Sequence, residues 1–180
     1  MSHMWNLVKI GSDWYHTDVT WDDPLNSRNQ ADQYGIVYHD NFLISTAALK
    51  KTGHYGIPNV KAVNTRFDNK YWRKVESGFW YQSGQFIYGT SNGIYSRSRL
   101  NGSSAKCLKK LSVRCLVQHS PKQYYLISGN KIYLFHTGSR KLKMIYQAAG
   151  CSLVQLKYEE GKLMFRYLKG NRLYSAEKAA

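Results

Sequence analysis

A three-fold recurrence in the C-terminal part of the chain constrains the fold more than any other feature. Each copy pairs a strand-like run with a second run that carries an aliphatic residue followed by Tyr, across a turn that holds Gly or Asn. The copies begin at Gln85, Gln123 and Lys162, which are 38 and 39 residues apart. A period near 40 residues, built from short strands and Gly/Asn turns, is typical of propeller blades or of a related β-meander. The alternative is that aromatic strands resemble one another by composition alone.

The number of copies limits how such a region can close. The paired runs are 85–88 with 93–95, 123–126 with 131–133, and 162–165 with 172–174. A propeller needs at least about four blades, so we expect an open stack of antiparallel sheets, or a partial propeller completed by the N-terminal part. Short helices are expected only at 46–52 and 69–77. The predicted fold class is therefore mainly β, with an antiparallel hairpin followed by propeller-like β-meander repeats.

The positive charge of the chain lies in one part of it. The 180 residues carry 26 Lys and Arg against 11 Asp and Glu, but residues 1–60 hold only 4 basic residues against 6 acidic ones. Residues 61–180 hold 22 basic residues against 5 acidic ones. This asymmetry predicts two domains, 1–60 and 61–180, of which the second would attract polyanions such as nucleic acid, anionic lipid or an anionic cell-wall polymer. Nucleic acid is an unlikely partner because no motif that reads RNA or DNA is present.

The chain shows no sign of a membrane span, a cofactor or a metal site. No apolar run approaches the ~20 residues of a membrane span, so no transmembrane segment is expected. Cys107, Cys115 and Cys151 lack the spacing of zinc ligands, and we interpret them as core thiols, with a disulfide between the first two left open. Four aspartates between residues 13 and 23 lack the spacing of a calcium loop. Neither a metal nor a cofactor is predicted.

The N-terminal stretch reads as a β-hairpin with arms 5–10 and 13–21 around a Gly-Ser turn. A two-residue turn makes facing positions add up to 23, which places His3 and Asp18 on one face as diagonal neighbours, with roughly 5–8 Å between their Cβ atoms. A carboxylate at that distance can accept the imidazole N–H and stabilise the imidazolium. This is the orienting half of a nucleophile–His–Asp triad. A purely structural His–Asp pair is the alternative.

The same residues resemble a known family. From His3 to Pro24 the chain reads His-x-Trp-Asn and then Trp-Tyr-x-x-Asp-x-Thr-Trp-Asp-Asp-Pro. This resembles the signature of bacterial transglutaminase-like domains, which are papain-related cysteine acyltransferases and proteases. Residues 42–45 resemble the family's next strand. Residues 65–73 and the β-repeats resemble the C-terminal extension of some surface-associated clostridial-type members.

The resemblance implies roles for two residues. His3 would be the general base and Asp18 its orienting residue, with an upstream cysteine as the nucleophile. The substrates would be protein or peptide amides, and the location extracellular or in the cell envelope. The run Met-Ser-His-Met at the start can also be left by an expression vector, but the spacing of His3 from the Trp-Asn pair matches the family.

The chain departs from the family at the nucleophile. Only Met1 and Ser2 precede His3, so the family's cysteine and its helix are absent from this sequence. We therefore expect a C-terminal fragment of a transglutaminase-like cysteine acyltransferase or hydrolase that is inactive by itself. The alternative function is a non-catalytic basic β-repeat module that binds an anionic cell-wall polymer or nucleic acid. The other five histidines show no pattern, and no role is predicted for them.

Overall fold

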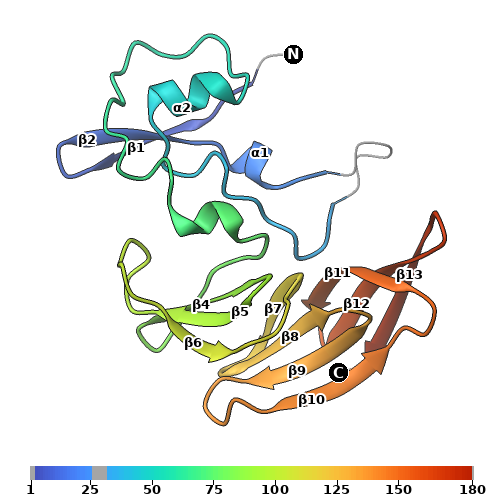
Figure 1. Ribbon diagram of the computed structural model, residues 1–180. Coiled ribbons are helices and arrows are strands. Elements are labelled where there is room, and N and C mark those ends of the chain that lie inside the picture. The colour runs from blue at the N-terminus through green and yellow to red at the C-terminus, as the bar shows by residue number, and fades with distance from the viewer. Residues whose placement is uncertain (1–2, 26–31, 180) are drawn as a thin grey trace. The chain divides into compact units, whose positions relative to one another are not determined.

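The computed structural model describes residues 3–25 and 32–179 (Figure 1). Within these ranges the chain is mainly β, with antiparallel sheets and few helices, as the sequence predicts. It divides into two compact units, residues 1–31 with 37–74 and residues 32–36 with 75–180. The expected boundary at 60/61 differs from this division, because residues 61–74 belong to the first unit and residues 32–36 join the second.

The first unit opens with the predicted hairpin. Strands β1 (Asn6–Ile10) and β2 (Asp13–Thr17) pair antiparallel, with Asn6 opposite Thr17 and Ile10 opposite Asp13. The facing positions add up to 23, so the predicted register is confirmed. Gly11 turns the chain with a φ of +64°, a conformation that glycine adopts without steric cost.

The second arm of the hairpin is shorter than predicted. Strand β2 ends at Thr17, and residues beyond it form a single helical turn, α1 (Val19–Asp22). Asp18 caps this turn, because its Oδ1 accepts the backbone N–H groups of Thr20 at 3.0 Å and Trp21 at 3.1 Å. Aspartate is a preferred N-cap residue, and this local hydrogen bonding competes with extension of the strand. The expectation of a strand up to residue 21 was therefore wrong.

Two short helices occupy the predicted places. They are α2 (Thr46–Lys51) and the 3₁₀ helix η1 (Tyr71–Lys74). Ser45 caps α2 by accepting the backbone N–H of Ala48 at 3.1 Å, and Asp68 in turn accepts both the N–H and the hydroxyl of Ser45. The expected strand at 42–45 is reduced to an isolated bridge between Ile44 and β2.

A small aromatic core supports this unit. Tyr15 of β2 and Trp72 of η1 are buried, and both pack against Phe67, with ring centroids 4.9 Å and 5.7 Å away. Ile44 and Leu49 are buried as well. The hairpin, α2 and η1 thus form one core that fixes the hairpin from which the candidate site residues project.

The second unit consists of three successive antiparallel sheets (Figure 1). Within each sheet, each strand pairs with its neighbour in sequence, and the predicted runs form the hairpins β4–β5, β8–β9 and β12–β13. The strands of the first sheet are β3 (Trp80–Gln82), β4 (Gln85–Thr90), β5 (Gly93–Arg97) and β6 (Lys106–Lys109). The second sheet has β7 (Cys115–Ser120), β8 (Gln123–Ser128), β9 (Lys131–His136) and β10 (Leu142–Gln147). The third has β11 (Ser152–Glu159), β12 (Lys162–Lys169) and β13 (Arg172–Ala179).

Strand β8 of the middle sheet is buried on both of its faces. Alternate residues of β8 enter two separate cores: Tyr124 and Leu126 pack with the first sheet, while Tyr125 and Ile127 pack with the third. Side chains that alternate between faces at a period of two are expected of a strand. The recurrence in sequence therefore corresponds to an open stack of three sheets within the described residues.

The cysteines of the second unit form no disulfide. All three are unpaired, so the open alternative of a bridge between Cys107 and Cys115 is not realised. Cys115 is fully buried, and burial raises the pKa of its thiol to about 12. In the part of the chain that the structure describes, no helix is long and apolar enough to cross a membrane.

Candidate functional site

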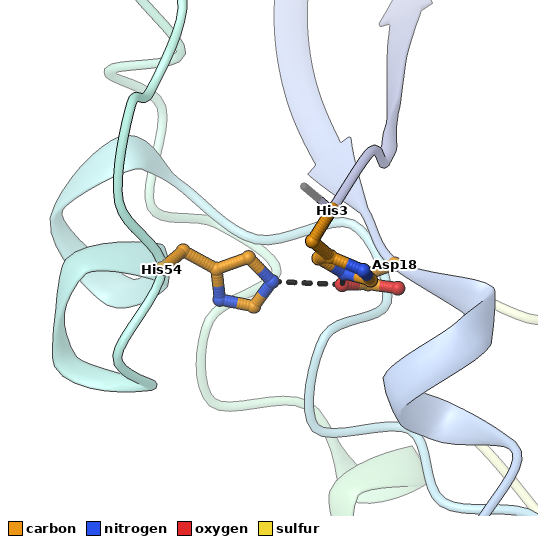
Figure 2. Close-up of side chains that lie close together, drawn as sticks. All are labelled: His3, Asp18 and His54. Carbon is orange, nitrogen blue, oxygen red and sulfur yellow. Dashed lines mark hydrogen bonds and ion pairs between the residues drawn. The ribbon is translucent and has the colours of Figure 1, made fainter. Parts of the chain in front are cut away.

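The hairpin brings the two predicted site residues into contact. His3 lies just before β1, Asp18 lies just after β2, and Nε2 of His3 contacts Oδ2 of Asp18 (Figure 2). The side chain of Asp18 is 1% exposed and that of His3 is 28% exposed. The carboxylate is therefore fixed inside the unit, while the imidazole lies at its surface.

Asp18 accepts hydrogen bonds with both of its oxygens. Oδ1 accepts the two backbone N–H groups of the α1 turn, and Oδ2 faces His3 and a second histidine, His54. Burial alone would raise the pKa of Asp18, but its hydrogen bonding with His3 and His54 and the hydrogen bond from the Trp21 amide outweigh it, and the pKa is lowered. Asp18 is thus held as a carboxylate in a buried position.

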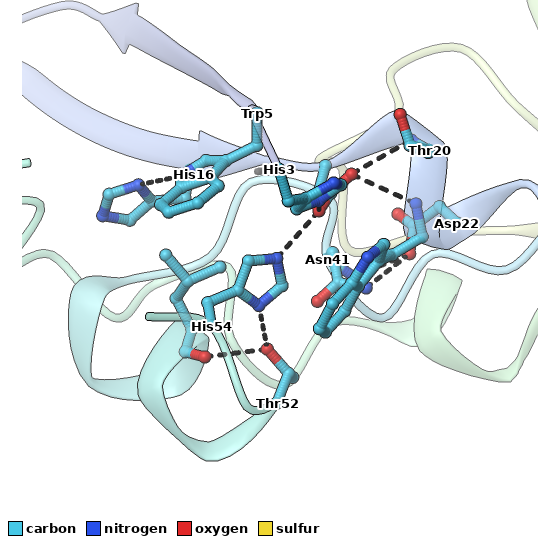
Figure 3. A network of polar contacts seen from close by, with 11 residues as sticks. His3, Trp5, His16, Thr20, Asp22, Asn41, Thr52 and His54 are labelled. Atoms are coloured by element: carbon cyan, nitrogen blue, oxygen red, sulfur yellow. Dashed lines mark hydrogen bonds and ion pairs between the residues drawn. The ribbon is translucent and has the colours of Figure 1, made fainter. Parts of the chain in front are cut away.

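His54 is a site residue that the sequence analysis missed. Its Nε2 lies 2.8 Å from Oδ2 of Asp18 (Figure 2). Its Nδ1 lies 2.8 Å from the hydroxyl oxygen of Thr52 (Figure 3). The side chain is completely buried. Gly53, with a φ of +88°, turns the chain after α2 and so returns His54 toward the hairpin. A single histidine between two glycines was the available signal, and it is a weak one.

Two tryptophans enclose the histidines. The ring of Trp21 stacks on His3 with centroids 5.2 Å apart and lies 4.1 Å from His54, while Trp5 meets His54 edge to face at 5.0 Å. These four residues, with Gly53 and Tyr55, line a cavity of about 280 Å³. Both imidazoles border this cavity, but only that of His3 is exposed to solvent.

His16 has a fixed role in the polar network around the site (Figure 3). The indole N–H of Trp5 donates to its Nδ1 at 3.0 Å, so this nitrogen carries the lone pair. Its Nε2–H is then left to donate to the hydroxyl of Thr46 at 3.0 Å. Burial lowers the pKa of His16, and His54 adds to this effect. His16 is therefore a neutral structural histidine that orients Trp5.

Asp22, the last residue of α1, carries a second buried carboxylate. Its Oδ1 accepts the backbone N–H of Asn41 at 2.9 Å and the side-chain amide of the same residue at 3.1 Å (Figure 3). Burial raises the pKa of Asp22 to about 6, because these two hydrogen bonds offset only part of the desolvation. Asp22 thus ties the α1 turn to the loop before α2.

No thiol belongs to the unit that contains this cluster. All three cysteines of the sequence lie in the second unit. The arrangement of His3 and Asp18 can accept and hold a proton, and no cysteine of the first unit lies beside it. The convergent nitrogen and oxygen atoms of His3, Asp18 and His54 lie within 4.8 Å of one another, so these three residues could also hold a metal ion.

Comparisons with known proteins identify no family. No family model matches the chain, and no curated protein matches it. Among solved structures the chain is similar to the N-terminal domain of Nup159, at 12% sequence identity and a TM-score of 0.43. The likeness covers 62% of this chain and 32% of the Nup159 chain, so this chain spans about a third of that length. These comparisons give no support to the transglutaminase-like resemblance.

Proposed function

We propose that His3 and Asp18 are the general base and the orienting carboxylate of a transglutaminase-like cysteine acyltransferase or hydrolase. The chain would be the C-terminal part of that protein, with the hairpin of its core followed by propeller-like β-repeats. The contact between Nε2 of His3 and the buried Oδ2 of Asp18 is the observation that carries the proposal. The substrates would be protein or peptide amides at the cell envelope.

In the proposed reaction, each ring nitrogen of His3 has a separate task. Asp18 accepts the Nε2–H, which fixes the tautomer and leaves the lone pair on Nδ1. Nδ1 can then take the proton of a cysteine thiol, whose thiolate attacks the amide carbonyl. The imidazolium is stabilised by the carboxylate and returns the proton to the leaving amine. A second amine or water then releases the acyl group from sulfur.

The surroundings suit this proton transfer. Two backbone N–H groups hold Oδ1 of Asp18, so the carboxylate keeps its position when the charge on His3 changes. Trp21 stacks on the imidazole and limits its contact with water. A pre-positioned base of this kind contributes roughly 10²- to 10⁴-fold to the rate of acyl transfer.

The proposal predicts that this chain by itself is inactive. The test is an assay of the purified chain for incorporation of a fluorescent amine into a glutamine-containing protein and for release of ammonia. We expect no turnover, because the first unit lacks a thiol. Turnover that His3→Ala abolishes would show that a nucleophile is present after all.

The reading frame upstream of the chain tests the proposal further. An in-frame cysteine motif ahead of His3 supports it, whereas a genuine start codon with its own ribosome site favours a binding module. If the cysteine is encoded, the longer protein should lose at least about 10²-fold in kcat with His3→Ala and with Asp18→Asn. The control variant, His39→Gln, changes a histidine of the same unit outside the cluster. Full activity in the His3 variant would refute the assignment.

A second candidate function rests on the charge of the second unit. This unit holds 17 Lys and Arg against 5 Asp and Glu, a formal charge of +12. A charge of this size attracts polyanions over its surface. The second unit would then act as a binding module for an anionic cell-wall polymer, with or without a catalytic partner.

A further inference from the structure

The hydrogen bonds of Thr52 determine which nitrogen of His54 carries the proton. The hydroxyl of Thr52 has a single proton, which it donates to the carbonyl oxygen of Leu49 at 2.7 Å. The oxygen of Thr52 can therefore only accept from Nδ1 of His54, at 2.8 Å. This fixes the proton of a neutral His54 on Nδ1 and leaves the lone pair on Nε2.

That lone pair faces another acceptor. Nε2 of His54 lies 2.8 Å from Oδ2 of Asp18, and both atoms carry lone pairs when the imidazole is neutral. Both side chains are buried, so water does not separate them. Two buried acceptors this close to one another require a positive centre between them, either an additional proton or a metal ion.

A second histidine nitrogen contacts the same oxygen of Asp18. Nε2 of His3 contacts Oδ2 of Asp18, and the three atoms lie within 4.8 Å of one another. Two imidazole nitrogens and one carboxylate oxygen form a ligand set that suits zinc, with a fourth position left for water or another ligand. The cavity of about 280 Å³, which both histidines line, gives room for that fourth ligand.

We propose that His3, Asp18 and His54 bind one divalent metal ion of the zinc class, through Nε2, Oδ2 and Nε2. The inference does not depend on acyl transfer. Contacts outside the cluster already orient two of the ligands, since Thr52 holds Nδ1 of His54 and two backbone amides hold Oδ1 of Asp18. Loss of such outer contacts typically weakens metal binding 10- to 100-fold.

The metal requires a small change in the cluster. Ligand atoms about 2.0–2.2 Å from a tetrahedral zinc lie farther apart than hydrogen-bonded atoms do. His3 can make this adjustment, because its side chain is 28% exposed and it precedes β1. To bind the metal through Nε2, His3 would give up the proton on that nitrogen, either to its own Nδ1 or to solvent, and the metal would replace the hydrogen bond that Asp18 accepts.

The experiment uses the whole chain after dialysis against a chelator. Zn²⁺ is titrated by calorimetry, and Co²⁺ is used as a probe because its visible absorption reports tetrahedral coordination. We expect one ion per chain. His54→Gln and Asp18→Asn should each weaken Zn²⁺ binding at least ten-fold.

Two further variants make the result specific. Thr52→Val keeps every ligand but leaves Nδ1 of His54 without its acceptor, so it should weaken Zn²⁺ binding about 10- to 100-fold. His39→Gln removes a histidine outside the cluster and should leave affinity unchanged. Circular dichroism without metal checks that each variant is folded. Asp18→Asn keeps an acceptor for the α1 cap, so it decides the outcome if the His54 variant is misfolded.

Two outcomes of the Zn²⁺ titration would overturn the inference. If Zn²⁺ does not bind, or binds equally to the parent, His54→Gln and Asp18→Asn, a proton occupies the position between His54 and Asp18. No activity is measured in these experiments. Failure of metal binding therefore leaves the acyl-transfer proposal standing, and failure of acyl transfer leaves the metal site standing.

Discussion

The buried carboxylate of Asp22 should make the first unit less stable as the pH rises through the mildly acidic range. Asp22 is 6% exposed, and burial raises its pKa from the ordinary value of 3.8 to about 6. The native state therefore holds a proton on this group between about pH 4 and 6, where the unfolded chain has already lost it. The contribution of Asp22 to stability is therefore fully present below about pH 4 and is lost as the pH rises through about 6.

The size of the effect follows from the shift. About two pKa units, at about 1.4 kcal/mol each, correspond to a loss of up to about 3 kcal/mol by pH 7. Asp22→Asn removes the charge but keeps an oxygen that can accept both N–H groups of Asn41. We expect the variant to match the parent near pH 4 and to exceed it by up to about 3 kcal/mol at pH 7.

Urea denaturation followed by tryptophan fluorescence measures this difference. Four of the five tryptophans lie in the first unit, so the signal reports mainly its unfolding. His16 acts in the opposite direction in the same range, because burial lowers its pKa and stability falls as the pH drops below about 6.5. Since both proteins contain His16, its contribution cancels in the difference between them.

The control variant changes the aspartate next to Asp22. Asp23→Asn changes the exposed neighbour of Asp22 and should alter the free energy of unfolding by no more than about 0.5 kcal/mol. If the difference between Asp22→Asn and the parent stays constant from pH 4 to 8, or if the variant is the less stable protein at pH 7, the reasoning fails.

Three further predictions concern the second unit. Gly35→Ala should destabilise the second unit by more than Gly129→Ala does, as measured by urea denaturation followed by circular dichroism. Both glycines have a left-handed φ, but a Cβ on Gly35 would lie 2.3 Å from a carbonyl oxygen of β11, whereas a Cβ on Gly129 would meet open space. Equal losses would show that φ strain alone matters. Iodoacetamide should modify Cys107 and Cys151 before Cys115 in the native protein, because burial raises the pKa of Cys115 to about 12; equal rates by mass spectrometry would contradict this. Binding to heparin or teichoic acid should weaken steeply with salt, as log K falls linearly with log[salt] when counterions are released; binding that salt leaves unchanged would exclude an electrostatic module.

The parts of the fold that the sequence predicted are those set by local pattern. A two-residue turn at Gly11 fixes the hairpin register, because the side-chain period of two allows no intermediate pairing. The recurrence near 40 residues locates the hairpins of the three sheets for the same reason. In both cases the partners are close in sequence, and each turn determines which residues face one another.

The features that the sequence did not predict arise where a side chain competes with strand formation, or where two residues far apart in the chain come into contact. Strand propensity predicts an extended Val19, but the carboxylate of Asp18 binds two amides ahead of it and starts a helical turn. His54 reaches Asp18 from 36 residues away, through the turn at Gly53 and the packing of α2. Neither contact has a periodic signal, so the His–Asp pair was predicted and its third member was not.

The position of one proton separates the two roles proposed for the cluster. As a base, His3 must carry a proton on Nε2, which Asp18 accepts, and a lone pair on Nδ1. As a metal ligand, the same residue must offer the lone pair of Nε2, so the two states exclude each other at any one moment. A metal ion on Nε2 of His3 would then inhibit acyl transfer. His54→Gln would weaken that inhibition, while His3→Ala would abolish the reaction itself, so the two histidines give different signatures.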